Sequence, residues 1–591
     1  MKKKNISALA FVVLSVAGIS GCSKFLDRQP LSKISPSSAF NSESELQLYV
    51  NSFYDAMFPN SDNDNNGFTS LYNEDADNIV KSQLSSTSNP GSRTVPVSGG
   101  GWSWGNLRNI NYFLQNYQTG GLPSSVTNKY AGAAKFFRAY FYFNMVARFG
   151  DVPFYNKAMD SNDSLGLMLP RTPRTVVMDS VMQDLDFAIN NLPTGKDVAS
   201  VTKWTALALK SRAALFEGTF RKYHTEMGLQ GANTFLQASA DASLALMQSG
   251  YALYTGSPAA AAYRDLFASY NPQVSEVILA RQYSSSLSIF HNVNYYTITP
   301  SYGKPGLEKK LVNSYLMKDG TRFTDQPGFD TMTFYHETQN RDPRLGQTIR
   351  IPGYARIGTT VALVPSFSAT VTGYQLVKFV TGTVDDSFNK SYNALPIFRY
   401  AEVLLNYAEA KAELETLTQQ DLDKSIQLIR SRVGMPALNM DAANANPDTY
   451  LASDYGNVTG INKGVILEIR RERRIELVME GLRYNDLMRW KEGHLLANQF
   501  KGEYFPGTGN YDLDGDGKAD LIIYSGTKPT GSNIQFLKLG NDVILENGDK
   551  GGNILVNSNI PKTFNESRDY LYPIPTQETL LNPKLDQNPK W

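Results

Sequence analysis

Alternating aspartates between residues 511 and 521 form the pattern with the clearest chemistry. The segment reads YDLDGDGKADL, and its spacing is typical of a calcium-binding loop. The candidate ligands are four carboxylates and one backbone carbonyl, those of Asp512, Asp514, Asp516, Lys518 and Asp520. Gly517 stands where such a loop needs a sharp turn, but Ile523 replaces the bidentate Glu that closes an EF-hand. We therefore expect either a structural Ca²⁺ site whose closing ligand comes from elsewhere or a hydrophilic turn between two strands.

Residues that could support enzymatic chemistry are sparse. The four histidines, His224, His291, His336 and His494, lie too far apart in the sequence to share a helical turn. The sequence contains neither zinc-ligand spacing nor a phosphate-binding Gly loop with Lys and Ser. Two distant acids could still meet in the fold as the carboxylate pair of a glycoside hydrolase, although no pattern nominates them. The sequence favours a non-catalytic protein.

Two polar loops carry aromatic residues in a composition that suits sugar binding. Sugars stack flat C–H faces on aromatic rings, and their hydroxyl groups need polar partners around those rings. The candidates are Tyr72, Asp75, Asp77 and Trp102 in the first region and Asn294, Tyr295, Tyr296 and Tyr302 in the second. Trp102 follows three glycines and is the better stacking candidate, whereas we expect Trp104, which opens a helix, to lie in the core.

The N-terminus predicts export and lipidation. Three lysines at positions 2–4 precede an apolar run over 6–19, which is shorter than the ~20 residues needed to span a bilayer. Small residues precede Cys22, the only cysteine, as in the lipobox cut by the lipoprotein signal peptidase. We expect residues 1–21 to be removed and Cys22 to be acylated. An ordinary signal peptide with a leftover unpaired cysteine is the alternative.

Composition limits the partners. The chain has 591 residues, of which 41% are hydrophobic, so it can bury a large core or two fused ones. A formal net charge of +1 argues against nucleic acid or an anionic membrane surface as the main partner. The 33 tyrosines against 5 tryptophans suit ligand recognition through planar, partly wet surfaces, but they also suit an aromatic core.

Helical periodicity covers most of the chain outside two regions. We expect helices over 42–57, 104–117, 123–149, 173–191, 201–221, 233–248, 401–415 and 421–433. Residues 251–394 instead consist of short β-prone pieces, such as 277–282, 295–299 and 374–379, and residues 502–563 are similar. Paired helices at this density predict a helical-repeat scaffold that carries an irregular insertion.

The longest helical period runs from Gly464 to Glu492. It carries an apolar stripe and also a row of four carboxylates at every fourth residue, those of Glu468, Glu472, Glu476 and Glu480. This row would be unfavourable on an isolated helix. We expect Arg471, Arg473 and Arg483 to neutralise it within a partly buried helix that ends at Gly481, followed by a short helix over 482–490.

The segment ERRIELVMEGLRYNDLMRWKEG resembles the signature of the SusD/RagB family of outer-membrane nutrient-binding lipoproteins. Three further stretches support the resemblance in the family's order: FFRAYFYFNMVARFGDVPF from Phe136, LPIFRYAEVLLNYAEAKAEL from Leu395 and YLYPIPTQETLLNPKLDQNPKW from Tyr570. Together they span nearly the whole mature chain. The resemblance implies a mainly α fold, with tetratricopeptide-like helical pairs and an insertion rich in loops and short strands.

We divide the chain into five regions on this basis. They are a signal peptide over 1–21, a lipidated tether over 22–41, a helical region over 42–250, a ligand-binding region of loops and short strands over 251–394, and a C-terminal region over 395–591 that contains the Asp loop 512–520.

The resemblance also implies a function. It describes a lipoprotein of the outer membrane that binds a nutrient, expected to be an oligosaccharide, and delivers it to a TonB-dependent transporter of the SusC type. Family members grip ligands with aromatics on loops in these regions, so the resemblance transfers regions and not single residues. A surface glycoside hydrolase and a helical-repeat scaffold that binds only protein remain alternatives, and the ligand could also be a peptide or a modified glycan.

Overall fold

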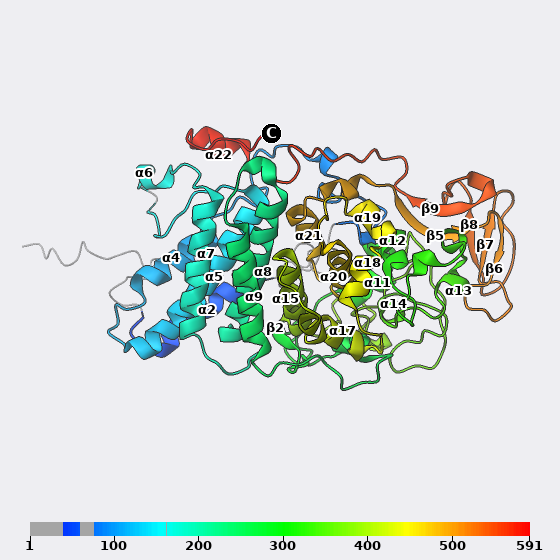
Figure 1. Cartoon of the computed structure of the whole chain (residues 1–591), viewed down its shortest axis with the longest axis horizontal. Helices are drawn as coiled ribbons and strands as arrows, with labels where there is room; N and C mark the ends of the chain where they lie inside the picture. The colour runs from blue at the N-terminus through cyan, green and yellow to red at the C-terminus, as the bar shows by residue number, and fades with distance from the viewer. Residues whose placement is uncertain (1–39, 59–75, 161) are drawn as a thin grey trace, which may run out of the picture.

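The computed structural model describes residues 40–58, 76–160 and 162–591. Helices stand side by side in one half of the molecule, and loops, short helices and small sheets make up the other (Figure 1). The long helices of the first half are α2 (Glu43–Met57), α4 (Gly105–Asn116), α5 (Ser124–Phe149), α7 (Arg174–Asn191), α8 (Lys203–Tyr223), α9 (Ala232–Met247) and α15 (Tyr400–Glu413). Contacts run from α5 to α7, α8, α9 and α15 in turn. The mainly α fold with paired helices is confirmed.

The remaining helices lie mostly outside this row, and all of them except the 14-residue α20 (Lys463–Glu476) are short. They are α6 (Ser164–Leu167), α10 (Ala262–Ala268), α11 (Val293–Ile298), α12 (Lys309–Ser314), α13 (Phe334–Glu337), α14 (Arg344–Thr348), α16 (Gln419–Asp423), α17 (Ile426–Arg432), α18 (Met440–Ala445), α19 (Thr449–Asp454), α20 (Lys463–Glu476), α21 (Arg483–Arg489) and α22 (Thr576–Leu581). Among the described residues, no helix has the length and apolar character needed to cross a membrane.

In the described part of the chain the strands form four small sheets. They are β1 (Ile79–Val80), β2 (Val277–Arg281), β3 (Gly306–Leu307), β4 (Leu395–Arg399), β5 (Phe500–Phe505), β6 (Gly509–Tyr511), β7 (Leu521–Tyr524), β8 (Gln535–Lys538) and β9 (Gly552–Val556). The pairs β1–β3, β2–β4 and β5–β9 are antiparallel. In the fourth sheet β7 lies between antiparallel β6 and parallel β8, with Tyr511 opposite Leu521 and Ile522 opposite Phe536.

Several sequence-based predictions of local structure were wrong. Residues 295–299 lie in or beside helix α11, where the hydroxyls of Thr297 and Thr299 donate to the carbonyls of Val293 and Tyr295, so that these β-prone residues satisfy a helical turn instead. Residues 374–379 form only isolated bridges. The helix predicted over 421–433 is divided into α16 and α17.

Helix α20 ends at Glu476 and not at Gly481 as predicted. Side chains from other elements donate hydrogen bonds to the backbone carbonyl groups that would otherwise accept the next hydrogen bonds of the helix. The Tyr263 hydroxyl donates to the Glu476 carbonyl at 2.6 Å, and the Lys378 ammonium donates to that of Val478 at 2.6 Å. The chain then turns through Met479, whose φ of 66° is left-handed.

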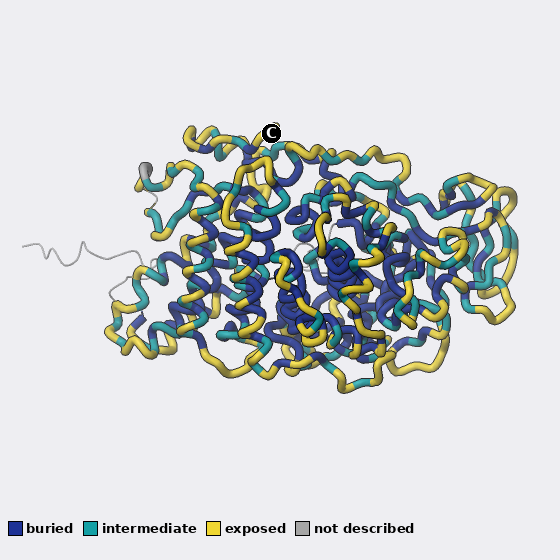
Figure 2. The backbone as a smooth tube through the Cα atoms, in the orientation of Figure 1, coloured by how far each residue is buried: buried dark blue, intermediate teal, exposed yellow. Residues whose placement is uncertain are grey.

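Within the described residues the core consists mainly of two large hydrophobic clusters, and Figure 2 shows the buried residues concentrated in the interior of the molecule. The first cluster fills the helical half and includes Val465, Leu467 and Ile469 of α20. The second fills the loop-and-strand half and includes Ile475 of α20 together with Val478. Helix α20 therefore belongs to both clusters.

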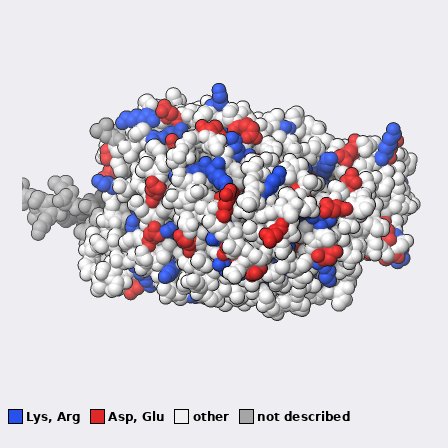
Figure 3. Space-filling model, in the orientation of Figure 1, with Lys and Arg blue, Asp and Glu red and all other residues white. Residues whose placement is uncertain are grey.

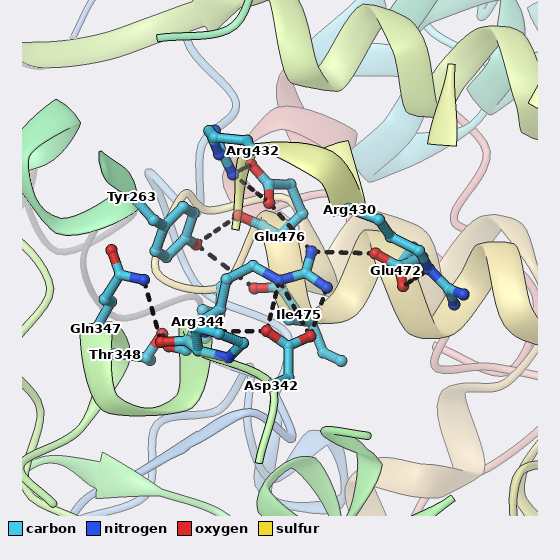
Figure 4. A network of polar contacts seen from close by, with 12 residues as sticks. Tyr263, Asp342, Arg344, Gln347, Thr348, Arg430, Arg432, Glu472, Ile475 and Glu476 are labelled. Atoms are coloured by element: carbon cyan, nitrogen blue, oxygen red, sulfur yellow. Dashed lines mark hydrogen bonds and ion pairs between the residues drawn. The ribbon is translucent and has the colours of Figure 1, made fainter. Parts of the chain in front are cut away.

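The carboxylate row of α20 is buried in a network of arginines (Figure 4). Glu476 accepts two hydrogen bonds from Arg432, at 2.6 and 2.7 Å, and one from Arg399 at 2.8 Å. Arg344 lies 3.0 Å from Glu472 and 3.3 Å from Glu476. Burial opposes ionisation of Glu476, but the surrounding guanidinium groups outweigh it and lower the pKa of this carboxyl to about 2.

The arginines that neutralise the row come mainly from other elements, which corrects the sequence-based prediction. Arg471 does pair with Glu468, at 3.1 Å. Arg473 pairs with Asp486 instead, and Arg483 pairs with Asp77. The helix is buried as expected, but the arginines that pair with its carboxylates come largely from chain segments distant in the sequence.

Candidate functional site

Four aromatic rings in the loop-and-strand half form a connected cluster that we call the aromatic ladder, made of Phe388, Tyr295, Tyr296 and Tyr302. Phe388 contacts Tyr296 as well as Tyr295, with ring centroids 6.5 Å apart. Ring centroids are 5.6 Å apart from Phe388 to Tyr295, 5.6 Å from Tyr295 to Tyr296 and 4.8 Å from Tyr296 to Tyr302. Phe388 is 53% exposed and Tyr296 only 8%, whereas Tyr295 and Tyr302 are partly exposed. The Lys81 ammonium lies 4.7 Å from the centre of the Tyr302 ring.

Helix α11 carries Tyr295 and Tyr296, and His291 holds the start of this helix. Its Nδ1 accepts from the backbone N–H of Val293 at 3.3 Å, and its Nε2 donates to the Asn393 carbonyl at 3.0 Å. This arrangement needs a neutral ring, because one nitrogen must accept while the other donates. Burial lowers the pKa of His291 to about 4 and keeps the ring neutral.

Two asparagines fasten α11 to the loop that carries Phe388. The Asn292 side chain donates to the side-chain oxygen of Asn389 at 2.7 Å and accepts from the backbone N–H of Asn389. Asn294 donates to Asp386 at 2.7 Å and accepts from the Thr381 N–H at 3.1 Å. The predicted ligand-binding residue Asn294 is thus fully buried and positions the ladder, whereas Tyr295, Tyr296 and Tyr302 form it.

The first predicted region is placed differently. Tyr72 and Asp75, like Cys22 and the signal peptide, lie outside the described residues. Asp77 is buried between two arginines, with oxygens 3.0 Å from Arg474 and 2.7 Å from Arg483. Burial opposes its ionisation, but these two guanidinium groups outweigh it and lower the pKa of Asp77. In this arrangement Asp77 ties the chain to α20 and α21.

Trp102 and Trp104 have the opposite exposure from that predicted. Trp102 is buried and packs edge-on against Trp104 and Phe149, with centroids 5.4 and 5.0 Å apart. Trp104 is partly exposed. Both rings line a mostly apolar cavity of about 450 Å³ beside α4, α6 and α22. Trp102 belongs to the first hydrophobic cluster, whereas the ladder packs on the second.

A groove of about 660 Å³ lies in the loop-and-strand half, and we call it the polar groove. It runs between β8, β9 and the segment 367–371. The side chains that matter for ligand chemistry are those of Ser82, Lys304, Phe367, Phe536, Asn541, Asp542 and Asn557.

Phe388 and the polar groove were not found from the sequence. The segment TVDDSFNKSYN around Phe388 has the same mixture of aromatic and polar residues as the two chosen loops, so the same rule would have selected it. No such signal marks the groove, because its walls, residues 367–371 and 535–557, lie far apart in the sequence.

The Asp loop forms the turn between β6 and β7. One carboxylate oxygen each from Asp512, Asp514 and Asp520 lie within 4.8 Å of one another. Asp516 instead pairs with Lys518 at 2.9 Å, on the exposed side of the loop. Burial raises the pKa of Asp520, and the charges of Asp514 and Asp512 act in the same direction. A cation at this point would relieve that repulsion.

Comparison with known proteins identifies the family. The SusD family profile matches residues 275–591, which is more than half of the chain. The chain belongs to the SusD family. A second profile, described as "Starch-binding associating with outer membrane", matches residues 24–215 of this SusD-family chain.

Relatives of this SusD-family protein share its fold at low sequence identity. A SusD-like protein of Formosa agariphila is 23% identical over 518 residues, covering 83% of this chain and 92% of the relative. A SusD-like carbohydrate binding protein of Bacteroides fragilis has a TM-score of 0.68 at 23% identity, covering 93% and 99% of the two chains. A laminarin binding SusD-like protein has a TM-score of 0.54 at 18% identity, with the same coverage.

Charged side chains are mixed on the face of the molecule shown in Figure 3. Lysines and arginines alternate with aspartates and glutamates there, without a large area of one sign. This face resembles an ordinary solvated surface and not a track for a polyanion.

Proposed function

We propose that this SusD-family protein binds an oligosaccharide at the cell surface through its aromatic ladder and delivers it to a TonB-dependent outer-membrane transporter of the SusC type. The ladder itself carries the proposal. The exposed ring of Phe388 and the partly exposed rings of Tyr295 and Tyr302 offer apolar surfaces on which the C–H faces of sugar rings can pack. Exposed Ser301 and Ser387, which are adjacent in the sequence to Tyr302 and Phe388, supply partners for hydroxyl groups.

The ladder is fixed before any ligand arrives. His291, Asn292 and Asn294 hold α11 and the Phe388 loop together through five hydrogen bonds between 2.5 and 3.1 Å and one of 3.3 Å. A site that is already ordered loses little conformational entropy on binding. This preorganisation supports a role in ligand capture.

The descriptions of relatives support carbohydrate as the ligand class. One structural neighbour is described as a carbohydrate binding protein and another as laminarin binding. We extend carbohydrate binding, but no particular glycan, to this chain.

The function is binding and not hydrolysis in this proposal. Glycosidic bond cleavage needs two carboxyl groups facing one bond. Asp542 is the only acid among the described residues that line the polar groove, and Asp386, beside the ladder, is held by Arg356 at 2.5 Å. Release of sugars from a candidate glycan would favour the hydrolase instead, and a barrel partner without any glycan binding would favour the scaffold.

We further propose that acylated Cys22 anchors the mature chain in the outer membrane. Several acyl chains give durable attachment where one gives only marginal binding. Labelling of cells with an alkyne fatty acid should mark the wild type and leave Cys22→Ala unmarked.

The Asp loop is proposed as a structural Ca²⁺ site. Carboxylate oxygens of Asp512, Asp514 and Asp520 converge there, and hard Ca²⁺ prefers several oxygen ligands on a tight turn. The backbone carbonyl of Lys518 and the carboxylate of Asp516 complete the ligand set expected from the spacing.

Affinity electrophoresis against plant, fungal and host polysaccharides tests the main proposal. Retardation by a glycan should be lost in Tyr295→Ala and Phe388→Ala. It should persist in Tyr524→Ala, which removes a half-buried ring on β7 outside the site. Trp102→Ala tests the other sequence candidate in the same gel. Retardation that survives both ladder variants would refute the ladder as the site.

A further inference from the structure

We infer that the polar groove continues the aromatic ladder and that the ligand is a neutral, linear oligosaccharide long enough to occupy both. The inference rests on the proposed function, because it extends the site that the ladder begins. In this inference the ladder holds the first sugar units of the oligosaccharide, and the groove holds the sugar units that follow them.

The ladder and the groove are joined by three consecutive residues. Tyr302 is the last ring of the ladder, Gly303 follows it, and Lys304 lines the groove. The N–H of Ser82, another lining residue, donates to the Gly303 carbonyl at 2.8 Å. Gly303 has a left-handed φ of 74°, and an added Cβ would lie 3.3 Å from Lys81 and Ser82. These contacts bring the Tyr302 end of the ladder next to the residues that line the groove.

The groove has the chemistry of a sugar site. Phe536 is a partly exposed ring, and Phe367 lies beneath the surface beside it. Exposed Asn541, Ser368 and Ser82 provide amide and hydroxyl groups around these rings. A volume of about 660 Å³ falls within the usual range for small-molecule sites, roughly 300 to 1,000 Å³.

Hydrogen bonds fix both walls of the groove. Gln535 of β8 donates to the Pro365 carbonyl at 2.8 Å and accepts from the Phe367 N–H at 2.8 Å, so it ties the strand to the opposite wall. Asn557 donates to the Lys81 carbonyl at 2.9 Å and ties the end of β9 to the ladder side. Hydrogen bonds therefore fix the walls of the groove, just as they fix the position of the ladder.

The charge of the groove indicates a neutral ligand. Lys304 and Asp542 are the only charged residues among the described residues that line it, one of each sign. A polyanionic glycan would need an excess of cations along its path. A hydroxyl-rich neutral chain needs only the amide, hydroxyl and ring surfaces that the groove provides.

Binding as a function of ligand length tests the inference. Isothermal titration of the full chain in detergent would use malto-, laminari-, xylo- and manno-oligosaccharides of two and six units. We expect the six-unit ligand of one series to bind at least about tenfold more tightly than the two-unit ligand, with Kd nearly unchanged between low and high salt.

Variants separate the groove from the ladder. Phe536→Ala and Asn541→Ala should each weaken binding of the six-unit ligand, by about tenfold for the ring, and leave the two-unit Kd unchanged. Tyr295→Ala should weaken both ligands. Tyr524→Ala on the adjacent strand is the matched control and should change neither Kd.

The outcomes distinguish this inference from the proposed function. Equal binding of the two-unit and six-unit ligands would show that the groove does not extend the site. The same conclusion would follow if the groove variants bound both ligands as the wild type does while Tyr295→Ala bound neither ligand. In both cases the ladder would remain the binding site. If none of the four series binds, both proposals fail. A Kd that rises steeply with salt would overturn the assignment to a neutral ligand. Asn541 is exposed, so its variant tests the groove even if Phe536→Ala fails to fold.

Discussion

At the scale of single residues, Glu476 shows how the molecule uses buried charge. Its carboxylate is fully buried and contacts Arg344, Arg399 and Arg432. Three guanidinium groups in one buried place are stable only while carboxylates balance them. The carboxylate is therefore a condition for folding and not a group held ready for a ligand.

The variant Glu476→Gln should destabilise the protein strongly. The amide side chain would keep the shape of the carboxylate but leave the arginines without one negative charge, at a cost of about 3 to 5 kcal/mol. Urea unfolding followed by tryptophan fluorescence would measure the change in the free energy of unfolding.

An exposed ion pair supplies the control for this variant. Asp55 is largely exposed and accepts from Arg281 at 2.7 Å. Asp55→Asn should cost less than about 1 kcal/mol, because water screens such pairs. Equal losses in the two variants would contradict the structural role assigned to the buried network.

His291 predicts a dependence of stability on pH. Burial lowers its pKa in the folded protein to about 4, from an ordinary value of 6.5. Between pH 4 and 6.5 the unfolded chain therefore binds a proton that the folded chain does not, and stability falls as the pH falls through this window. The slope from this residue is at most about 1.4 kcal/mol per pH unit.

The variant His291→Gln should reduce that slope. Thermal melts at about pH 4.5, 5.5 and 7, which bracket the window, would show a smaller loss of Tm on acidification than in the wild type. His336→Gln changes an exposed histidine and is the control. An unchanged acid dependence in His291→Gln would show that its neutral ring does not hold α11 as described.

At the scale of elements, sequence patterns predicted what depends on near neighbours. Helix α5 begins after Pro123 and stops at Gly150, whose φ of 73° is left-handed, and both signals are local. The end of α20 was misplaced because Tyr263 and Lys378, which cap it, lie about 200 and 100 residues earlier in the chain. The same reason explains the wrong arginine partners of the carboxylate row.

The candidate site shows the same division. Composition selected Tyr295, Tyr296 and Tyr302, which the structure brings together in the ladder. It could not show that Asn294 is buried or that Asp77 is taken by two arginines, because their partners are distant in the sequence. Residue types indicate what chemistry is available, whereas tertiary contacts decide which side chains can meet a ligand.

The Asp loop is an element whose behaviour should change with calcium. If millimolar Ca²⁺ exceeds Kd about a hundredfold, the gain of about 2.7 kcal/mol should raise Tm by roughly 2 °C relative to EDTA. Asp514→Asn should reduce the rise, because it removes a negative charge from the site although an amide oxygen can still bind Ca²⁺. Its side-chain oxygen can still accept from the Asp516 N–H, so the loop keeps its turn without calcium.

Asp516→Asn is the matched variant for the calcium experiment. Asp516 pairs with Lys518 and does not join the three converging carboxylates, so its loss should reduce the calcium response less than Asp514→Asn. An identical Tm in EDTA and in calcium for the wild type would contradict the site.

At the scale of the whole molecule, two contacts join parts that differ in architecture. Helix α20 contributes apolar residues to both hydrophobic clusters. The C-terminal segment returns to the helical half, where Asn588 donates to the Phe149 carbonyl at 2.9 Å and the Tyr572 N–H to that of Arg148 at 2.8 Å. Figure 1 shows the C-terminus lying above the long helices.

These connections predict that the two halves unfold together. Loss of the second cluster would expose Ile475 and Val478 and would separate Glu476 from its arginines. Helix α20 could then not remain packed in the first cluster, because the buried charge of Glu476 would have no partner. Hydrogen exchange in increasing urea should therefore give one midpoint for amides of α5 and for those of β5 and β9. Glu476→Gln should lower both midpoints by the same amount. Early exchange in β5 and β9 with α5 still protected would instead show that each cluster is stable alone and that α20 is a link between two independent domains.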